Sequence, residues 1–178
     1  MIHLTNEITL QTITNTDCDQ LHGLMVEIYP TAYQCFWKDA GTWYVESQYS
    51  KEQVEKELLA TNAEYYFVLF KEEIVGNFRI VWDEKLAGLS EKRQVKLHRV
   101  YLHQKTQGKG IGKALLSWLE KQAVKKGYST VWLDAMNAQP QAFEFYKKQG
   151  YQYHSHVYLP FELMYDEYRK MSQLYKNT

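Results

Sequence analysis

Cysteine, proline and long apolar runs are all scarce in this chain of 178 residues, which holds 2 cysteines and 3 prolines. Cys18 and Cys35 have neither a metal-binding nor a redox spacing, and without an export signal we expect both to be reduced thiols. No apolar run approaches the roughly 18 residues that a membrane span requires. The N-terminus also lacks the basic leader and apolar core of a signal peptide. These absences predict a cytoplasmic protein without a membrane anchor.

An excess of charge of one sign is absent too, because 21 lysines and arginines balance 21 aspartates and glutamates. The chain therefore has no net positive charge to attract nucleic acid or an anionic membrane, and we expect neither as a partner. His154 and His156 alternate along a predicted strand without a carboxylate or cysteine partner at metal-ligand spacing. We therefore expect no metal site, and any recognition of charge must be local.

We expect one domain over residues 1–178, since domains typically contain about 100 to 200 residues and no linker or repeat interrupts the chain. Apolar periodicity predicts the element order βααβββαβαβα, which indicates an α+β, or mixed α/β, domain. The expected strands are 2–12, 64–70, 74–82, 95–102, 129–135 and 151–161. The expected helices are 16–28, 50–62, 111–127 and 137–149, with a C-terminal helical extension over 161–178.

Aromatic residues are dense between Tyr29 and Tyr49, a stretch whose pattern predicts no element. Together with Glu27, Asp39 and Glu46 they could enclose a cationic amine through cation–π and carboxylate contacts. Packing of large rings in the core explains the same aromatic residues equally well. Both interpretations stay open at this point.

Three glycines alternate in QGKGIG, residues 107–112, directly before an apolar pattern with helical spacing. Glycine-rich turns before helices bind phosphate, because amide N–H groups converge on the anion and the helix dipole adds attraction. The dinucleotide fingerprint fails because Lys113 occupies its third glycine position, and the P-loop fails because Ala114 follows Gly112-Lys113. A third spacing, Gln/Arg-x-x-Gly-x-Gly/Ala, is matched at every fixed position.

This third spacing resembles the cradle for the pyrophosphate of acetyl-coenzyme A (acetyl-CoA) in the GNAT superfamily of N-acetyltransferases. The resemblance spans 96–151: LHRVYL is similar to the family's fourth strand, and NAQPQAFEFYKKQGY to its Asn…Ala…Phe-Tyr…Gly-Tyr/Phe pattern. The upstream stretch ESQYSKEQVEKEL is weakly similar to bacterial diamine and polyamine acetyltransferases. The resemblance implies a GNAT fold, whose central twisted sheet is mostly antiparallel, splays at the acetyl-CoA site and is flanked by helices.

The resemblance also implies roles for individual residues. The pantetheine arm of acetyl-CoA is expected along the edge of the fourth strand at Val100, Tyr101 and Leu102. Asn137 is expected to bind the same arm, to cap a helix, or both. Tyr146 stands where the family commonly has the proton donor to the thiolate, with core packing as the alternative for its ring. The cradle comprises Gln107, Gly108, Lys109, Gly110, Ile111, Gly112 and Lys113.

The base that accepts the proton of the amine is less easily assigned. Many relatives use a glutamate on the fourth strand, where this chain has Lys96. Strand alternation places His98 on the same face, and histidine titrates near neutral pH. His98 is therefore the candidate base, with a structural role as the alternative.

We expect an acetyl-CoA-dependent N-acetyltransferase that acts on a primary amine of a small molecule, with polyamines as the favoured subclass. Lys96 in place of the usual base keeps open a non-catalytic acetyl-CoA sensor, and a protein N-acetyltransferase is a further alternative. The C-terminal helix could serve as the contact of a homodimer.

Overall fold

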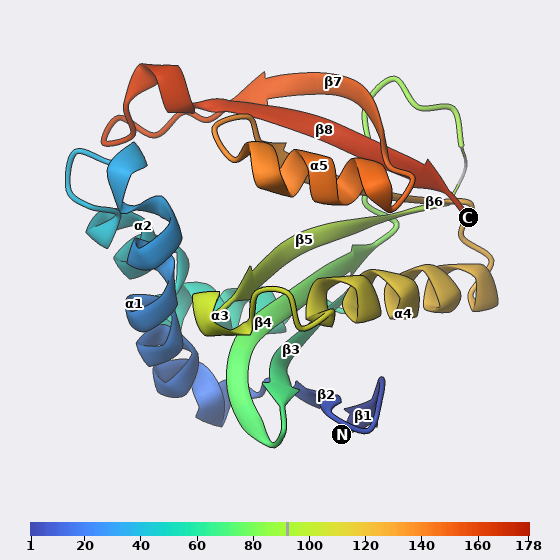
Figure 1. The fold of residues 1–178 in the computed structure, drawn as a ribbon, viewed down its shortest axis with the longest axis horizontal. Helices are drawn as coiled ribbons and strands as arrows, with labels where there is room; N and C mark the ends of the chain where they lie inside the picture. Colours follow the sequence, from blue (N-terminus) through green and yellow to red (C-terminus); the bar gives the residue numbers. More distant parts are fainter. Residues whose placement is uncertain (92) are drawn as a thin grey trace.

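The computed structural model describes residues 1–91 and 93–178, which form one eight-stranded twisted sheet flanked by helices (Figure 1). The strands are β1 (Ile2–His3), β2 (Ile8–Thr12), β3 (Ala63–Phe70), β4 (Glu73–Trp82), β5 (Gln94–Leu102), β6 (Thr130–Met136), β7 (Gln152–Tyr158) and β8 (Lys170–Asn177). The helices are α1 (Cys18–Tyr33), α2 (Thr42–Gln48), α3 (Lys51–Leu58), α4 (Ile111–Lys125) and α5 (Pro140–Lys148).

The strand order is β1-β2-β3-β4-β5-β6-β8-β7. Within the described ranges β5 and β6 pair in parallel, whereas all other neighbours pair antiparallel. The mixed α/β class with a mostly antiparallel sheet, predicted above, is therefore confirmed. No helix in this part of the chain is long and apolar enough to cross a membrane.

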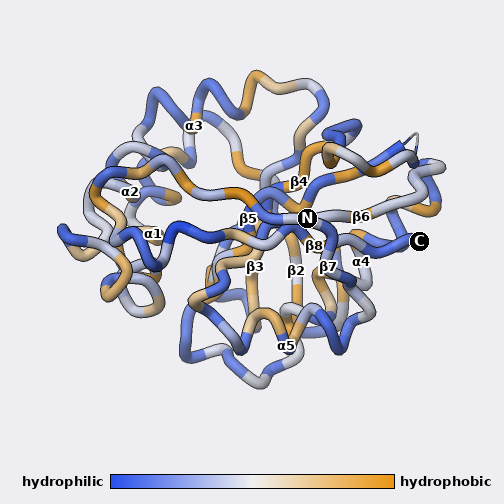
Figure 2. The backbone as a smooth tube through the Cα atoms, turned by 90° about the horizontal axis from the view of Figure 1, so that it is seen from above, coloured by the Kyte–Doolittle hydropathy of each residue, from blue (hydrophilic) through white to orange (hydrophobic). Residues whose placement is uncertain are grey.

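Two apolar cores lie on opposite faces of the sheet. Helices α1, α2 and α3 pack on one face, and α4 and α5 pack on the other. Figure 2 shows the strands between α3 on one side and α5 on the other. Because each helix buries one apolar stripe against a strand face, the two layers of helices fix the sheet between them.

Helix α4 shows how the sequence builds one of these layers. Ile111, Leu115 and Leu119 recur every four residues and are fully buried against the sheet. The helix begins after Gly110, whose φ of 76° is left-handed, and the chain leaves it through Gly127, whose φ is 75°. The predicted helix from 111 to 127 is therefore confirmed as far as Lys125, and it begins directly behind the glycine segment.

The two parallel strands separate part of the way along their length. Residues Gln94 to Leu97 of β5 pair with Thr130 to Leu133 of β6. Beyond Leu97, β5 continues beside β4 alone, while β6 stays paired with β8 as far as Met136. Figure 1 shows β5 diverging from β6 on the side where α5 lies. One edge of β5 therefore carries backbone groups without a strand partner.

The predicted C-terminal helix over 161–178 is wrong, because Lys170–Asn177 forms strand β8, which lies between β6 and the edge strand β7. The side chains of β8 alternate between the two faces of the sheet, with Ser172 and Leu174 buried. Its backbone pairs with β6 along one edge and with β7 along the other. This long-range pairing overrides the helical spacing of the apolar residues. The first helix also differs from the prediction, since α1 continues through Pro30 to Tyr33.

Leu119→Ala should lower the free energy of unfolding by about 2–5 kcal/mol, since it leaves a cavity under α4. Val124→Ala is the matched control on the same helix, because Val124 is 59% exposed, and its effect should stay within about 0.5 kcal/mol. Urea unfolding followed by circular dichroism measures both changes. Equal losses for the two variants would contradict the packing of α4.

Candidate active site

The glycine segment presents a row of free amides at the start of α4. Among the described residues, none accepts a hydrogen bond from the amides of Gly110, Ile111, Gly112 and Lys113. Apart from the glycine itself and its two chain neighbours, no atom of the described residues lies within 4 Å of the position that a Cβ would take at Gly108 or Gly110. The four free amides and the positive end of the helix dipole together suit an anion.

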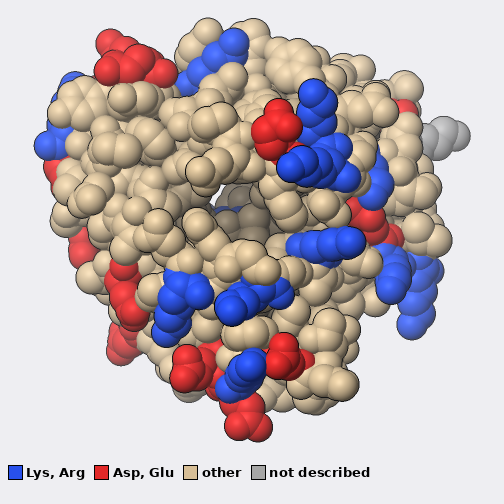
Figure 3. Space-filling model, viewed as in Figure 1, with Lys and Arg blue, Asp and Glu red and all other residues tan. Residues whose placement is uncertain are grey.

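Three hollows follow one another from this segment into the interior. The cradle hollow, of about 320 Å³, is lined by residues that include Gln107, Gly108 and Gly110 to Lys113. The edge cavity, of about 480 Å³, shares Gln107, Gly108 and Gly112 with it and extends along β5 to α5. The tyrosine cavity, of about 270 Å³, extends further toward α1 and α2. In Figure 3 the molecule is visibly hollowed between α5 and β5, with basic side chains below and beside the opening.

The edge cavity and the tyrosine cavity meet at the unpaired stretch of β5. Both are lined by Leu97, Val100, Tyr101 and Tyr146. His103 donates its amide to the carbonyl of Val75 on β4 at 2.7 Å. Backbone groups of successive residues point alternately to the two edges of a strand, so the backbone N–H and C=O groups of Tyr101 also face β4. The N–H and C=O groups of Val100 and Leu102 face the free edge. Of the three predicted edge residues, two therefore direct their amides toward the cavities.

Tyr146 lies on α5 at the junction of these two cavities. Its side chain is largely buried and packs edge-on against Phe145 and Tyr151. Burial, with a smaller effect of nearby Tyr33, raises the pKa of the Tyr146 hydroxyl, so it stays protonated near neutral pH. This hydroxyl has no hydrogen-bond partner among the described residues, which leaves it free to donate to a bound molecule.

Two other predicted binding residues lie outside this arrangement. The amide of Lys109 donates to the carbonyl of Thr106 at 3.2 Å, so it is not among the free amides of the cradle hollow. Asn137 does not cap α5, whose N-cap is Gln139, and its side-chain oxygen accepts a hydrogen bond from Ser172 at 2.9 Å. Asn137 therefore holds β8 against β6, and the prediction that it caps the helix is wrong.

Six tyrosine and phenylalanine rings line the tyrosine cavity, namely Tyr29, Tyr33, Tyr44, Tyr101, Tyr146 and Phe161. Tyr29 and Tyr44 stack at 4.5 Å between ring centroids, and the hydroxyls of Tyr44 and Tyr101 lie 2.9 Å apart. Burial, with a smaller effect of Tyr44, raises the pKa of Tyr33 to about 12, so this hydroxyl remains a donor. Part of the aromatic stretch thus lines a cavity, while Trp37 and Tyr49 pack in the core.

The acidic residues expected near these rings lie elsewhere. Glu27 pairs with His103 at 3.0 Å, and Glu46 pairs with His22 at 3.3 Å. The carboxylate of Asp39 accepts hydrogen bonds from the amides of Gly41 and Trp43 at the start of α2. None of these three acidic residues lines the tyrosine cavity.

His98 lines the tyrosine cavity, but its contacts disfavour the predicted role as a base. Arg79 donates from Nη1 to Nδ1 of His98 at 2.9 Å. Since arginine can only donate, Nδ1 is the acceptor and the proton of the neutral ring is on Nε2. Burial, together with the positive charges of Arg99, Arg79 and Lys96, lowers the pKa of His98 to about 2. The imidazole is therefore neutral and poorly basic near neutral pH.

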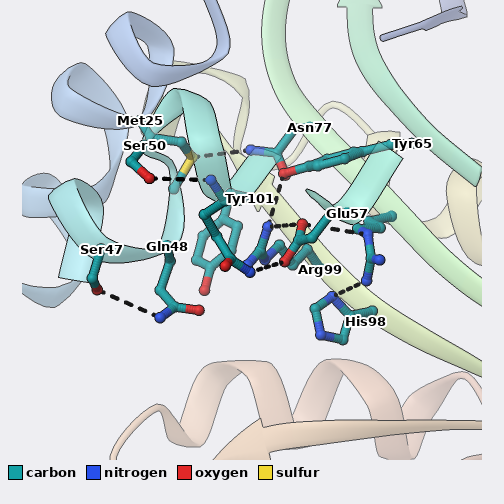
Figure 4. Close-up of polar contacts among 12 residues, drawn as sticks. Met25, Ser47, Gln48, Ser50, Glu57, Tyr65, Asn77, His98, Arg99 and Tyr101 are labelled. Atoms are coloured by element: carbon teal, nitrogen blue, oxygen red, sulfur yellow. Dashed lines mark hydrogen bonds and ion pairs between the residues drawn. The ribbon is translucent and has the colours of Figure 1, made fainter. Parts of the chain in front are cut away.

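A buried charge cluster lies behind His98 (Figure 4). Glu57 on α3 accepts a hydrogen bond from Arg99 at 2.6 Å and lies 3.5 Å from Arg79, and Arg99 also reaches the Tyr65 hydroxyl at 3.3 Å. All three charged side chains are at most 10% exposed. The two arginines share one carboxylate, so the cluster has a net positive charge. Sequence reasoning missed this cluster, although charged residues inside apolar strands were a visible signal.

A second charged pair lies where β5 and β6 separate. Lys96 pairs with Asp134 of β6 at 2.8 Å, and its ammonium lies 4.3 Å from the ring centroid of Trp132. Gln173 of β8 donates to the other oxygen of Asp134 at 3.2 Å. Both Lys96 and Asp134 line the tyrosine cavity. Sequence reasoning missed Asp134, the one carboxylate within the apolar strand VWLDA.

Within residues 1–91 and 93–178, no group of three or more His, Cys, Asp or Glu side chains could hold a metal ion. The geometry instead combines free amides, an unpaired strand edge, a buried tyrosine and an aromatic cavity.

Residues 24–151 match the Acetyltransferase (GNAT) family. The chain belongs to this family. This GNAT protein is 21% identical over 117 residues to an uncharacterized N-acetyltransferase in the pepI 3′ region of Lactobacillus delbrueckii subsp. lactis, across 65% of this chain and 68% of the relative. The predicted family and enzyme class, an N-acetyltransferase, are therefore confirmed.

Solved structures confirm the GNAT fold over nearly the whole chain. A PaiA N-acetyltransferase from Thermoplasma acidophilum, in complex with coenzyme A, superposes with a TM-score of 0.72 at 20% identity, covering 96% of this chain and 99% of that one. A mutant of the spermidine N-acetyltransferase SpeG from Vibrio cholerae gives a TM-score of 0.65 at 14% identity, covering 97% and 95%. RimL, a ribosomal-protein α-N-acetyltransferase in complex with coenzyme A, gives 0.72 at 15%, covering 99% and 97%.

The lowered pKa of His98 predicts an acid sensitivity of the fold. In the unfolded chain the pKa of histidine is about 6.5, so below this pH the unfolded state binds a proton that the folded state rejects. Stability is therefore present above pH 6.5 and is lost as the pH falls from 6.5 toward 2. Between pH 7 and pH 5 the wild type should lose about 2 kcal/mol more unfolding free energy than His98→Gln. Urea unfolding at both pH values tests this, and equal losses would contradict the buried neutral imidazole.

Proposed function

We propose that this GNAT acetyltransferase takes the acetyl group from acetyl-CoA and transfers it to a primary amine of a small molecule. The observation that carries the proposal is the line of three hollows, which runs from the free amides of α4 along the unpaired edge of β5 to the tyrosine cavity. The edge cavity and the tyrosine cavity meet at Tyr146. In this proposal acetyl-CoA reaches Tyr146 through the edge cavity, and the amine reaches it through the tyrosine cavity.

The cradle hollow suits the pyrophosphate of the acetyl donor. Its free amides, from Gly110 to Lys113, can each donate to a phosphate oxygen without losing a protein partner. Gly108 and Gly110 keep the approach open because neither has a side chain. The edge cavity then offers the amides of Val100 and Leu102 to the pantetheine arm, in the manner of an added strand.

Acetyl-CoA, when bound, supplies the thioester, and the residues where the edge cavity and the tyrosine cavity meet supply hydrogen-bond donors to it. An amide on the free edge of β5 can donate to the carbonyl oxygen as negative charge develops there. As the amine nitrogen bonds to the acetyl carbon and the carbon–sulfur bond breaks, the Tyr146 hydroxyl, which stays protonated near neutral pH, can donate its proton to the departing sulfur. The proton that the amine nitrogen loses then restores the hydroxyl. Phe161 and the cavity tyrosines exclude water from the amine.

The size of the tyrosine cavity supports a small acceptor over a protein chain. Its volume of about 270 Å³ is just below the range for small-molecule sites, about 300 to 1,000 Å³. The unpartnered hydroxyl of Tyr146 at the cavity junction favours an enzyme over an acetyl-CoA sensor. The names of neighbours such as SpeG support a polyamine acceptor, whereas the charges of this cavity do not. A homodimer and a cytoplasmic location stay predictions from the sequence alone.

Gly110→Val should raise the Kd for coenzyme A by at least about 10-fold, because a β-branched residue cannot keep the left-handed backbone that aligns the amides. Gly23→Val is the matched control, since Gly23 is in α1 with no atom near its Cβ position, and it should bind coenzyme A as the wild type does. Isothermal titration calorimetry measures both. Unchanged affinity in Gly110→Val would contradict the proposed cradle.

Tyr146→Phe should lower kcat by about 100-fold or more, because it removes the proton donor and keeps the packing of the ring. The Kd for coenzyme A should change by less than about threefold. Tyr151→Phe is the control, since it removes a neighbouring buried hydroxyl that likewise has no hydrogen-bond partner among residues 1–91 and 93–178. Thiol release from acetyl-CoA with a panel of amines gives kcat. A wild-type kcat in Tyr146→Phe would leave only a packing role for Tyr146.

A further inference from the structure

The charges that line the tyrosine cavity do not suit a polycation. Within the described part of the chain, its charged lining residues are Lys96, Arg99 and Asp134. Asp134 is thus the one carboxylate in the lining, and Lys96 already pairs with it at 2.8 Å. A polyamine carries several ammonium groups, and because the lining offers the single carboxylate of Asp134, the others would lose water without gaining a carboxylate. An acceptor that carries its own anionic group meets this lining better.

His98 adds a fixed hydrogen-bond donor to the same wall. Arg79 occupies Nδ1, so Nε2 carries the proton and faces away from the charge cluster. In Figure 4 the ring of His98 points away from Glu57, toward the side to which Gln48 and Tyr101 also point. All three residues line the tyrosine cavity. The wall therefore offers an N–H group to an oxygen atom of a bound molecule.

The buried cluster behind His98 strengthens the attraction for an anion. Arg79 and Arg99 share the single carboxylate of Glu57, and burial keeps water from screening the remaining positive charge. On β5, Lys96 and His98 are two residues apart, beside the irregularity in the pairing with β4, and both line the tyrosine cavity, so one carboxylate can approach both side chains. The ammonium of Lys96, the N–H group of His98 and the net positive charge of the buried cluster thus all favour an anionic group at this wall.

Asp134 provides the opposite charge at a short distance. A molecule that brings its carboxylate to Lys96 and His98 would place a neighbouring ammonium beside Asp134, so the single ion pair would be replaced by two complementary contacts. The aromatic walls, which include Tyr29, Tyr44 and Phe161, would enclose an apolar side chain. These three requirements describe an amino acid.

We propose that the acceptor is a zwitterionic amine of the amino-acid type with a large apolar or aromatic side chain, whose carboxylate is bound by Lys96 and His98 and whose amine is bound by Asp134. This inference rests on the proposed function, since it names the acceptor class of that same acetyl transfer. It assigns to Lys96 a role in recognition of the acceptor at the position where many relatives have a base.

Matched pairs of amines test the proposal. Phenylalanine and phenethylamine, tyrosine and tyramine, and leucine and isopentylamine differ only by the carboxylate, and spermidine serves as the polycation. For the best pair, we expect kcat/KM to be at least about 10-fold higher for the amino acid, the discrimination that one charge-assisted contact provides. A preference for the amine without a carboxylate, or for spermidine, would overturn the proposal and leave the proposed acetyltransferase activity intact.

Calorimetry gives a readout that does not depend on turnover. The coenzyme A complex should bind the N-acetyl amino acid, or the free amino acid, at least about 10-fold more tightly than the analogue without a carboxylate. If no amine is acetylated and an amino acid still binds, the proposed transfer to small amines fails and the site assignment stands. If no amino acid binds to the coenzyme A complex, the site assignment fails.

Variants of Lys96 and His98 test whether these residues cause the preference for an acceptor with a carboxylate. Lys96→Met should reduce the preference for the carboxylate by about 10-fold, because it removes the cation and frees Asp134 for an amine alone. His98→Leu should also reduce it, and His98→Gln, which keeps an N–H donor, should restore part of it. Lys121→Met is the control, since Lys121 is exposed on α4, and it should keep the wild-type preference. Coenzyme A binding should be unchanged in all four, and an unchanged preference in Lys96→Met would overturn the role of Lys96.

Discussion

The separation of β5 from β6 beyond Leu97 is the constraint on which the proposed site depends. Strand β6 pairs with β8 over its whole length and β5 continues beside β4, whereas β5 and β6 pair with each other only as far as Leu97 and Leu133. The separation leaves the amides of Val100 and Leu102 without strand partners and opens the space that the two cavities occupy. Unpaired backbone groups inside a protein are costly, and a bound molecule that pairs with them recovers that cost. The free edge of β5 therefore suits the extended ligand that we propose for it.

The buried charges connect the core on the α3 side to the chemistry of the tyrosine cavity. Glu57 reaches from α3 to Arg79 on β4 and Arg99 on β5, so one carboxylate ties a helix to two strands. Burying three charges costs free energy that a purely apolar contact would not. In this protein burial, together with the positive charges of the cluster, lowers the pKa of His98 and keeps the ring neutral, and Arg79 fixes its tautomer. A structural network thus sets the hydrogen-bonding character of a cavity wall.

Features that depend on neighbouring residues could be predicted from the sequence. The glycine segment was identifiable because its spacing adjoins the apolar stripe of Ile111, Leu115 and Leu119 on one helix. Features that depend on distant partners could not. Strand β8 looked helical because its pairing with β6 and β7 is not visible in its own periodicity. Likewise Lys96 and Asp134, 38 positions apart, meet only because β5 and β6 are neighbours in parallel.

Amide hydrogen exchange with and without coenzyme A tests the central claim, that the donor occupies the free edge of β5 and the start of α4. We predict slower exchange on saturation at Val100, at Leu102 and from Gly110 to Lys113. Exchange at Tyr101 should stay unchanged, because its amide faces β4 in either state. Protection confined to other strands, or none at saturating coenzyme A, would contradict the account.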